Sequence, residues 1–112
     1  MEARNTKQWV RLVAAGDVTE GDVQRCDVGK SCIALFNLGG RFYATSDICT
    51  HAYAHLSDGY LDGETIECPL HQGLFHIPTG RAMAPPVTEN LRTYPVRVED
   101  GEVYVEIDAE EN

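Results

Sequence analysis

Two short stretches decide how this chain is interpreted: Cys49-Thr50-His51 and Cys68-Pro69-Leu70-His71. Each stretch places one cysteine and one histidine in a tight loop, and sixteen residues separate the two stretches. A loop of this kind presents a thiolate and an imidazole together. Two such loops that face each other supply two sulfurs and two ring nitrogens, which is a donor set typical of a metal centre.

Two kinds of metal centre use this donor set. In a [2Fe–2S] cluster, one iron can take both thiolates and the other both imidazoles, which raises the reduction potential above that of a four-cysteine cluster. Zinc also binds two cysteines and two histidines, but zinc ligands usually recur as Cys-Cys and His-His pairs with their own spacings. The mixed pairs favour the iron–sulfur cluster, with Cys49, His51, Cys68 and His71 as its ligands. A zinc-stabilised interaction module is the alternative.

Length and composition restrict the class of protein. The 112 residues suffice for one domain, 43% of them are hydrophobic, and the net charge is −9, which argues against a nucleic-acid partner. The chain contains no apolar run long enough to span a membrane and no signal-peptide pattern at its start. We therefore expect no membrane association and a cytoplasmic location, where four cysteines favour metal binding over disulfides.

The charge is unevenly distributed along the chain. Residues 42–80 contain no Lys or Arg, but they hold five acidic residues: Asp47, Asp58, Asp62, Glu64 and Glu67. A segment of one sign creates a field that can steer a basic partner. Simple solubility is the alternative explanation.

Outside the ligand loops, the chain is predicted to form short strands. Apolar or alternating segments predict strands at 9–14, 23–28, 32–38, 41–45, 65–67, 74–77, 93–99 and 102–107. Asp100-Gly101 between two alternating segments is a strong hairpin signal, and it predicts that Val96, Val98 and Val103 are buried with Val105 and Ile107. No segment predicts more than a turn or two of helix, and residues 14–20 are the candidate for a short one. Residues 47–90 are rich in Gly, Pro, His and Asp and indicate a loop-built subdomain.

The sequence resembles the Rieske family, and within it the ferredoxin components of bacterial aromatic-ring-hydroxylating dioxygenases. The two ligand pairs, the later Pro85-Pro86 and the segments 42–45, 57–59, 68–73 and 87–96 carry this resemblance, which covers nearly the whole chain. It implies an all-β fold in a single domain 1–112: a Rieske-type antiparallel β-sandwich with a small loop-rich cluster-binding subdomain at about 47–90. It also implies that a proline-containing third loop covers the cluster.

The resemblance further implies a function without catalysis by this chain. The protein is expected to be a monomeric one-electron carrier with one [2Fe–2S] cluster. A flavoprotein ferredoxin reductase that oxidises NAD(P)H would reduce it, and it would pass electrons to a terminal oxygenase. The rival interpretation is a small Rieske-like subunit of a nitrite reductase or another oxidoreductase complex. Many such subunits lack the ligands, whereas Cys49, His51, Cys68 and His71 are all present here.

Four positions refine the subtype. Respiratory Rieske proteins carry an extra, disulfide-forming cysteine in each ligand loop, where this chain has Ala54 and Leu70. They also carry hydroxyl residues that donate to sulfur, where this chain has Gly73 and Phe75. Because such hydrogen bonds stabilise the reduced state, their loss implies a potential near the low end of the Rieske range, roughly −150 mV.

The remaining histidines and cysteines are given structural roles. His55 and His76 lie off the motif and are expected at the surface or in packing, with electrostatic tuning of the cluster as the alternative. Cys26 and Cys32 flank the first predicted hairpin and are expected to pack as small hydrophobic residues. A cross-strand disulfide between them is the alternative.

The aromatic residues are expected mainly in packed positions. Trp9, Phe36, Phe42 and Tyr43 are predicted core residues. Core or rim packing is also favoured for Tyr53 and Tyr60, and exposure beside a docking face is the alternative.

Overall fold

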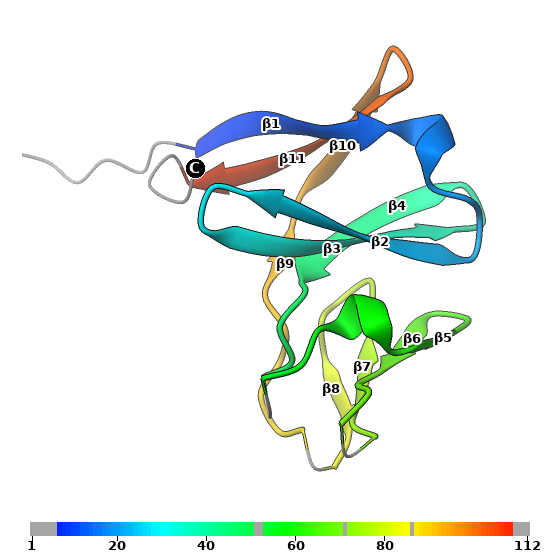
Figure 1. Ribbon diagram of the computed structural model, residues 1–112, viewed down its shortest axis with the longest axis vertical. Helices are drawn as coiled ribbons and strands as arrows, with labels where there is room; N and C mark the ends of the chain where they lie inside the picture. The colour runs from blue at the N-terminus through cyan, green and yellow to red at the C-terminus, as the bar shows by residue number, and fades with distance from the viewer. Residues whose placement is uncertain (1–6, 51–52, 71, 86, 109–112) are drawn as a thin grey trace, which may run out of the picture.

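The computed structural model describes residues 7–50, 53–70, 72–85 and 87–108, which form three antiparallel sheets arranged in layers (Figure 1). The first sheet has the order β1 (Lys7–Ala14), β11 (Glu102–Asp108), β10 (Val96–Glu99). The middle sheet has the order β2 (Asp22–Val28), β3 (Ser31–Leu38), β4 (Arg41–Ser46), β9 (Thr93–Tyr94). The small sheet has the order β5 (Tyr60–Asp62), β6 (Thr65–Glu67), β7 (Leu74–His76), β8 (Ala82–Ala84). Two 3₁₀ turns, η1 (Ala15–Asp17) and η2 (Leu56–Asp58), complete the described structure.

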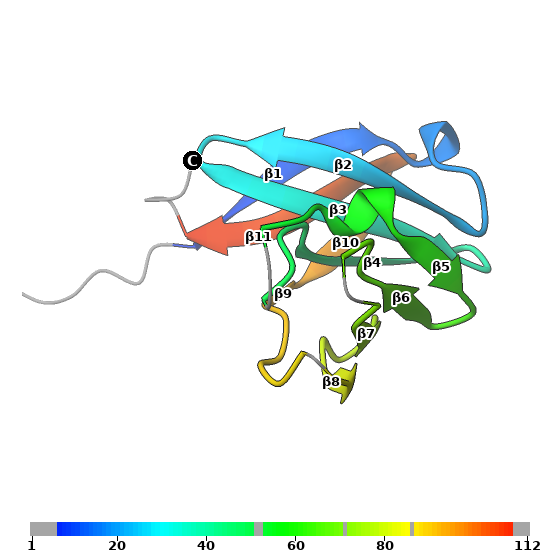
Figure 2. The same cartoon turned by 60° about the horizontal axis from the view of Figure 1, so that its bottom comes forward.

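Strand β3 has both faces buried, because it lies between two separate hydrophobic cores. Ile33 and Leu35 pack with residues of β11 in the core between the first and middle sheets. Ala34 and Phe36 point the opposite way, into the core shared with the small sheet, and all four side chains are fully buried. Burying one side chain of the size of Leu or Phe contributes roughly 1.5–3 kcal/mol. The continuous apolar run of β3 thus joins the sandwich to the small sheet. Figure 2 shows the three sheets from a second side.

The turn chemistry agrees with the sequence. Asp100 and Gly101 both have left-handed backbone, with φ of 53° and 77°, and they join β10 to β11 in register. Positive φ at both central residues is the conformation for which an Asp-Gly pair is selected in two-residue hairpins. This hairpin, and those after β2 and β3, are therefore confirmed.

Several expectations about secondary structure and burial were wrong. The predicted strand 93–99 is broken at Pro95, which cannot donate a hydrogen bond, and forms β9 and β10 in different sheets. The candidate short helix at 14–20 is a single 3₁₀ turn, and β5 and β8 were not predicted. Val98 is 48% exposed, because β10 is the edge of the first sheet and that side chain lies beyond the covered core.

The four predicted core aromatic residues differ in outcome. Phe36 is fully buried, as predicted, and Phe42 and Tyr43 are half-buried. Trp9 is instead 36% exposed, with the Arg97 guanidinium 4.4 Å from its ring centroid. This cation–π contact covers a ring that the core does not enclose.

In the described part of the chain, no helix has the length and apolar character needed to cross a membrane.

Candidate metal centre

The two cysteines of the motif begin loops that are closed in the same way. The Cys49 N–H donates to the carbonyl oxygen of Ala54 at 2.9 Å, and the Cys68 N–H donates to that of Gly73 at 2.7 Å. In each case the hydrogen bond links a cysteine to the residue five positions later. The two ligand loops, residues 49–54 and 68–73, are thus built alike. His51 and His71 lie outside the described residues, but their sequence positions fall within these closed loops.

The two thiols are buried beside each other. Cys49 is 4% exposed and Cys68 is fully buried. Burial raises the pKa of Cys68 to about 11, the Leu70 amide lowers that pKa, and the neighbouring Cys49 thiol raises it. Two adjacent sulfurs in an apolar core would repel each other as thiolates unless a cation compensates them. Cys49 and Cys68 would hold an iron as thiolates, and its positive charge would supply that compensation, so the donors present fit the cluster.

A third loop packs against both ligand loops. A Cβ placed on Gly73 would lie 2.5 Å from Cγ1 of Val87, so this backbone and side chain are in close contact. The Thr50 hydroxyl donates to the carbonyl oxygen of Glu89 at 2.8 Å. The segment around Val87–Glu89 therefore holds the two ligand loops in fixed positions. Pro86 lies outside the described residues, and its expected role in covering the cluster stays a prediction.

Four positions distinguish this chain from respiratory Rieske proteins, and their side chains carry no sulfur or hydroxyl. Ala54 is buried, Leu70 is 46% exposed, and the cysteines at 26, 32, 49 and 68 are all free. Phe75 is fully buried in the core between the middle and small sheets, and Gly73 contacts Val87. A side-chain hydroxyl is thus absent at both places from which respiratory relatives donate to sulfur. The low potential inferred from these residues stays a prediction.

Sequence analysis missed a group of polar side chains beneath the first ligand loop. The fully buried Asp47 carboxylate accepts hydrogen bonds from the amide and the hydroxyl of Ser57, at 2.7 and 2.9 Å. Its Oδ2 also lies 2.9 Å from Nδ1 of His55 and 3.7 Å from Sγ of Cys32. Residues from β3, the end of β4 and η2 meet here, so local spacing in the sequence carries no signal for the group.

The two remaining cysteines occupy opposite faces of one hairpin. Cys26 lies opposite Ile33 in the strand register and points into the core between the first and middle sheets. Cys32 lies opposite Asp27 and points toward Asp47. The alternative of a disulfide between them is therefore wrong. Burial raises the pKa of Cys26 to about 11 and, with Asp27 and Asp47, that of Cys32 to about 12. Cys26 packs as expected, but Cys32 also takes part in a polar network.

The acidic segment is divided between interior and surface. Asp47 is fully buried and does not contribute an exposed charge, whereas Asp58, Asp62 and Glu64 are exposed. Glu64 Oε1 lies 3.2 Å from Nε2 of His76. The surface field of the small sheet is thus set by fewer carboxylates than the sequence suggested.

Large apolar side chains are exposed around the ligand loops. Tyr53 follows the first motif and is 88% exposed, and Leu70 within the second motif is 46% exposed. Tyr60 and Met83 of the small sheet are 68% and 51% exposed. The packing favoured for Tyr53 and Tyr60 was therefore wrong, and their exposure agrees with the alternative.

Comparison with known proteins agrees with this geometry. A protein-family model described as the Rieske [2Fe–2S] domain matches residues 8–95. The chain is 47% identical over 102 residues to the ferredoxin component of the naphthalene 1,2-dioxygenase system of Pseudomonas putida, covering 91% of this chain and 98% of the relative.

Solved structures show the same similarity. One is the complex of reduced oxygenase and oxidized ferredoxin in carbazole 1,9a-dioxygenase, whose matching chain is 45% identical, with a TM-score of 0.82 over 87% of this chain and 91% of that one. A nitrite reductase small subunit from Mycobacterium tuberculosis matches with a TM-score of 0.80 over 93% of this chain and 98% of that one. At 23% identity it shows the fold alone. With twin closed loops that each begin at a buried cysteine, and a family match across most of its length, this chain belongs to the Rieske [2Fe–2S] domain family.

Proposed function

We propose that this protein is a one-electron carrier of a ring-hydroxylating dioxygenase system. It takes electrons from an NAD(P)H-dependent flavoprotein reductase and delivers them to a terminal Rieske non-haem iron oxygenase in aromatic-compound catabolism. The observation that carries this proposal is the pair of buried, adjacent thiols at the start of two identically closed loops. The likeness to ferredoxin components, over 91% of this chain, supports the choice of system.

In this proposal, Cys49, His51, Cys68 and His71 hold one [2Fe–2S] cluster in a single domain whose cluster-binding part is about 47–90. When bound, the cluster accepts and releases single electrons. The chain's own contribution is to fix the ligands. The hydrogen bonds at 49–54 and 68–73 set the loop shape, and the contacts of Val87 and Glu89 hold the loops together.

The surface around the ligand loops suits a transient partner. Tyr53 and Leu70 are exposed apolar side chains within or directly beside the two motifs. Redox partners bind through small interfaces, which permits fast release after electron transfer. We infer that the reductase and the oxygenase dock in turn on this surface, and that the carrier acts as a cytoplasmic monomer.

A reconstitution experiment tests the assignment. Purified reductase and oxygenase are assayed with the wild-type protein, with Cys68→Ser and without this component. Oxygenation should require the wild-type chain, and Cys68→Ser should lose both the reduced-state paramagnetic resonance signal and activity. Equal oxygenation without the chain would refute the carrier role, and an unchanged signal in Cys68→Ser or His71→Ala would refute the ligand set.

The two rival interpretations predict different observations in the same preparation. A zinc module would be colourless and would contain zinc in place of iron. A structural subunit would remain bound to a large catalytic subunit through purification. A red-brown protein that contains iron and separates from both partners would support the carrier.

A further inference from the structure

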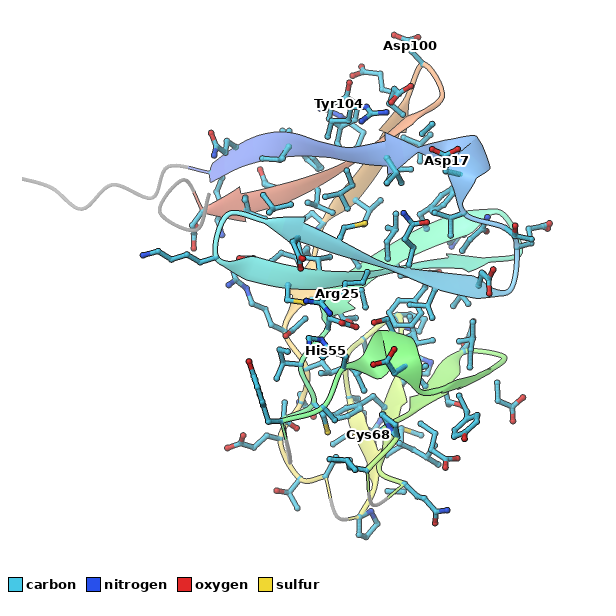
Figure 3. All side chains as sticks on the ribbon, in the orientation of Figure 1. Asp17, Arg25, His55, Cys68, Asp100 and Tyr104 are labelled. Atoms are coloured by element: carbon cyan, nitrogen blue, oxygen red, sulfur yellow. The ribbon has the colours of Figure 1, made fainter. Side chains whose placement is uncertain are left out.

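The strongest unexplained feature is the group Cys32, Asp47 and His55, which lies beneath the first ligand loop. The Cys32 Sγ is 3.7 Å from Asp47 Oδ2 and 3.7 Å from His55 Nδ1, and the last two atoms are 2.9 Å apart. One potential ligand atom from each residue lies within 4.8 Å of the others. Figure 3 shows His55 close to Arg25, on the side of the middle sheet that faces the small sheet.

These distances match one face of a metal tetrahedron. With metal–sulfur bonds of ~2.3 Å and metal–nitrogen or metal–oxygen bonds of ~2.0–2.1 Å, the edges of a tetrahedral zinc site are ~3.6 Å to sulfur and ~3.3 Å between nitrogen and oxygen. The observed edges of 3.7, 3.7 and 2.9 Å have the same order and nearly the same lengths. Small side-chain movements would suffice to seat an ion.

The donor types and their surroundings also suit a divalent ion. Thiolate, imidazole and carboxylate are the zinc ligands found in proteins. The Asp47 carboxylate is fully buried, and Ser57 holds it through two hydrogen bonds, the kind of outer support that orients metal-binding carboxylates. This carboxylate lies 2.9 Å from Nδ1 of His55, and the Arg25 guanidinium interacts electrostatically with both Cys32 and Asp47. A thiolate and a carboxylate together would balance a divalent cation.

The open side of the group faces a surface depression. Cys32 and His55 line this depression together with Ser46 and Tyr53, so water can reach the fourth position. Arg25 also lines it, and its guanidinium is paired with Asp27 at 3.4 Å. The group is thus accessible to an ion from solvent.

A catalytic Cys–His–Asp triad would need a different geometry. In such a triad, one ring nitrogen of the histidine faces the nucleophile and the other faces the carboxylate. Here the same atom, Nδ1 of His55, faces both Cys32 and Asp47. Convergence of three atoms on one point is the arrangement of metal ligands.

We propose that Cys32, Asp47 and His55 form a mononuclear site for a divalent metal ion of zinc-like ligand preference, separate from the [2Fe–2S] ligands. Asp47 and His55 bracket the loop that Cys49 and Ala54 close, and Ile48 and His55 form a β-bridge at its base. A bound ion would therefore fasten β3 to the base of the first ligand loop. Its role would be structural.

The test uses the cluster-loaded protein after a chelator wash, with two irons per chain verified before and after. Zinc chloride is titrated by equilibrium dialysis, and metal content is measured. We expect one zinc per chain, with no iron released. Cys32→Ser and His55→Gln should each raise the Kd by at least about 10-fold, since even loss of outer-sphere support costs a site roughly 10–100-fold.

The chain supplies matched controls for both substitutions. Cys26→Ser removes a free cysteine on the opposite face of the same hairpin, and His76→Gln removes a histidine bound to Thr79 and Glu64. Both should leave zinc affinity unchanged. Unchanged affinity in Cys32→Ser, zinc uptake only with iron loss, or no uptake below about 100 μM would overturn the proposal.

A second measurement decides the case if Cys32→Ser does not fold. In the wild-type protein, zinc should slow alkylation of Cys32 at least about 10-fold without affecting Cys26, as peptide mass analysis would show. Equal alkylation of Cys32 with and without zinc would overturn the site.

Discussion

Gly73 and Val87 are packed so closely that a side chain at position 73 has no room: its Cβ would lie 2.5 Å from Cγ1 of Val87. The residue that respiratory relatives replace with a hydroxyl is thus a point where the third loop rests on the second ligand loop. Introducing a serine there adds a donor and also displaces Val87. The two effects need to be separated experimentally.

Gly73→Ala isolates the steric effect. We expect it to lower the free energy of unfolding by roughly 1–3 kcal/mol through overpacking, and to accelerate iron loss. The measurement is denaturant unfolding of the cluster-loaded protein. Gly16→Ala is the matched control, because a Cβ at Gly16 meets no atom within 4 Å. The double variant Gly73→Ala/Val87→Ala should recover iron retention. Equal stability of the two single variants would contradict the packing argument.

Asp47 is expected to be the most sensitive polar residue outside the ligands. Asp47→Ala leaves the Ser57 amide without its acceptor, and an unsatisfied buried group costs about 1–3 kcal/mol. Thermal unfolding in the absence of added zinc, followed by iron content, measures the effect. Asp47→Asn retains an acceptor oxygen and should be milder. If Asp47→Ala equals wild type, the carboxylate does not support the first ligand loop.

The fall in the free energy of unfolding at alkaline pH should depend in part on Cys26. Burial raises its pKa to about 11, so the thiol ionises in the unfolded chain at lower pH than in the folded one. The unfolded state then binds fewer protons, and stability falls as pH rises from the unfolded pKa, ~8.5, toward 11. Denaturant titrations between pH 8 and about 11 should show a smaller fall in Cys26→Ala than in wild type. Parallel profiles would exclude this contribution.

The Asp100-Gly101 turn offers a test of the scaffold alone. Gly101 has φ of 77°, and Gly101→Ala should cost roughly 1–2 kcal/mol because a side chain disfavours left-handed backbone. Asp100→Asn is the control, since Asn tolerates that region. Iron content should be unchanged in both variants, because the turn is far from the ligand loops (Figure 3). Cluster loss in Gly101→Ala would show coupling that the fold does not suggest.

Electrostatic steering can be tested with two double variants that change the net charge by the same amount at different places on the surface. Asp58→Asn/Asp62→Asn removes two exposed charges beside the small sheet, and Asp17→Asn/Asp100→Asn removes two exposed charges on the side of the sandwich away from Cys68 (Figure 3). We expect only the first pair to slow electron delivery to the oxygenase, with a weaker salt dependence than wild type. Equal rates in both pairs would leave solubility as the role of the acidic segment.

The sequence predicted those parts of the fold that local chemistry determines. The Asp-Gly turn requires left-handed backbone, and the alternation in 102–107 follows the period of a strand, so both could be recognised from short windows. The split at Pro95 and the exposure of Val98 depend on which sheet a strand joins. Packing between distant parts of the chain determines which sheet a strand joins, so the local sequence does not predict it.

The residues of the site also fall into those that a local motif reveals and those that only the tertiary fold brings together. Cys49 and Cys68 were recognised from a compact motif. Asp47, His55 and Cys32 come together only because β3 and β4 pair and η2 folds back, so their proximity is a tertiary fact. Tyr53 was misjudged because aromatic character predicts burial on average, whereas a position beside a ligand loop places it in solvent.

The doubly buried strand β3 has a consequence for any attempt to transplant the metal centre. Residues 47–90 contain the motif, but Ala34 and Phe36, outside that range, form part of the wall of its core. A graft of the loops alone would lack these two side chains, and the apolar residues that they cover would be exposed to water. The smallest portable unit therefore includes the β3–β4 hairpin, and the sandwich and the metal centre should melt together in one step.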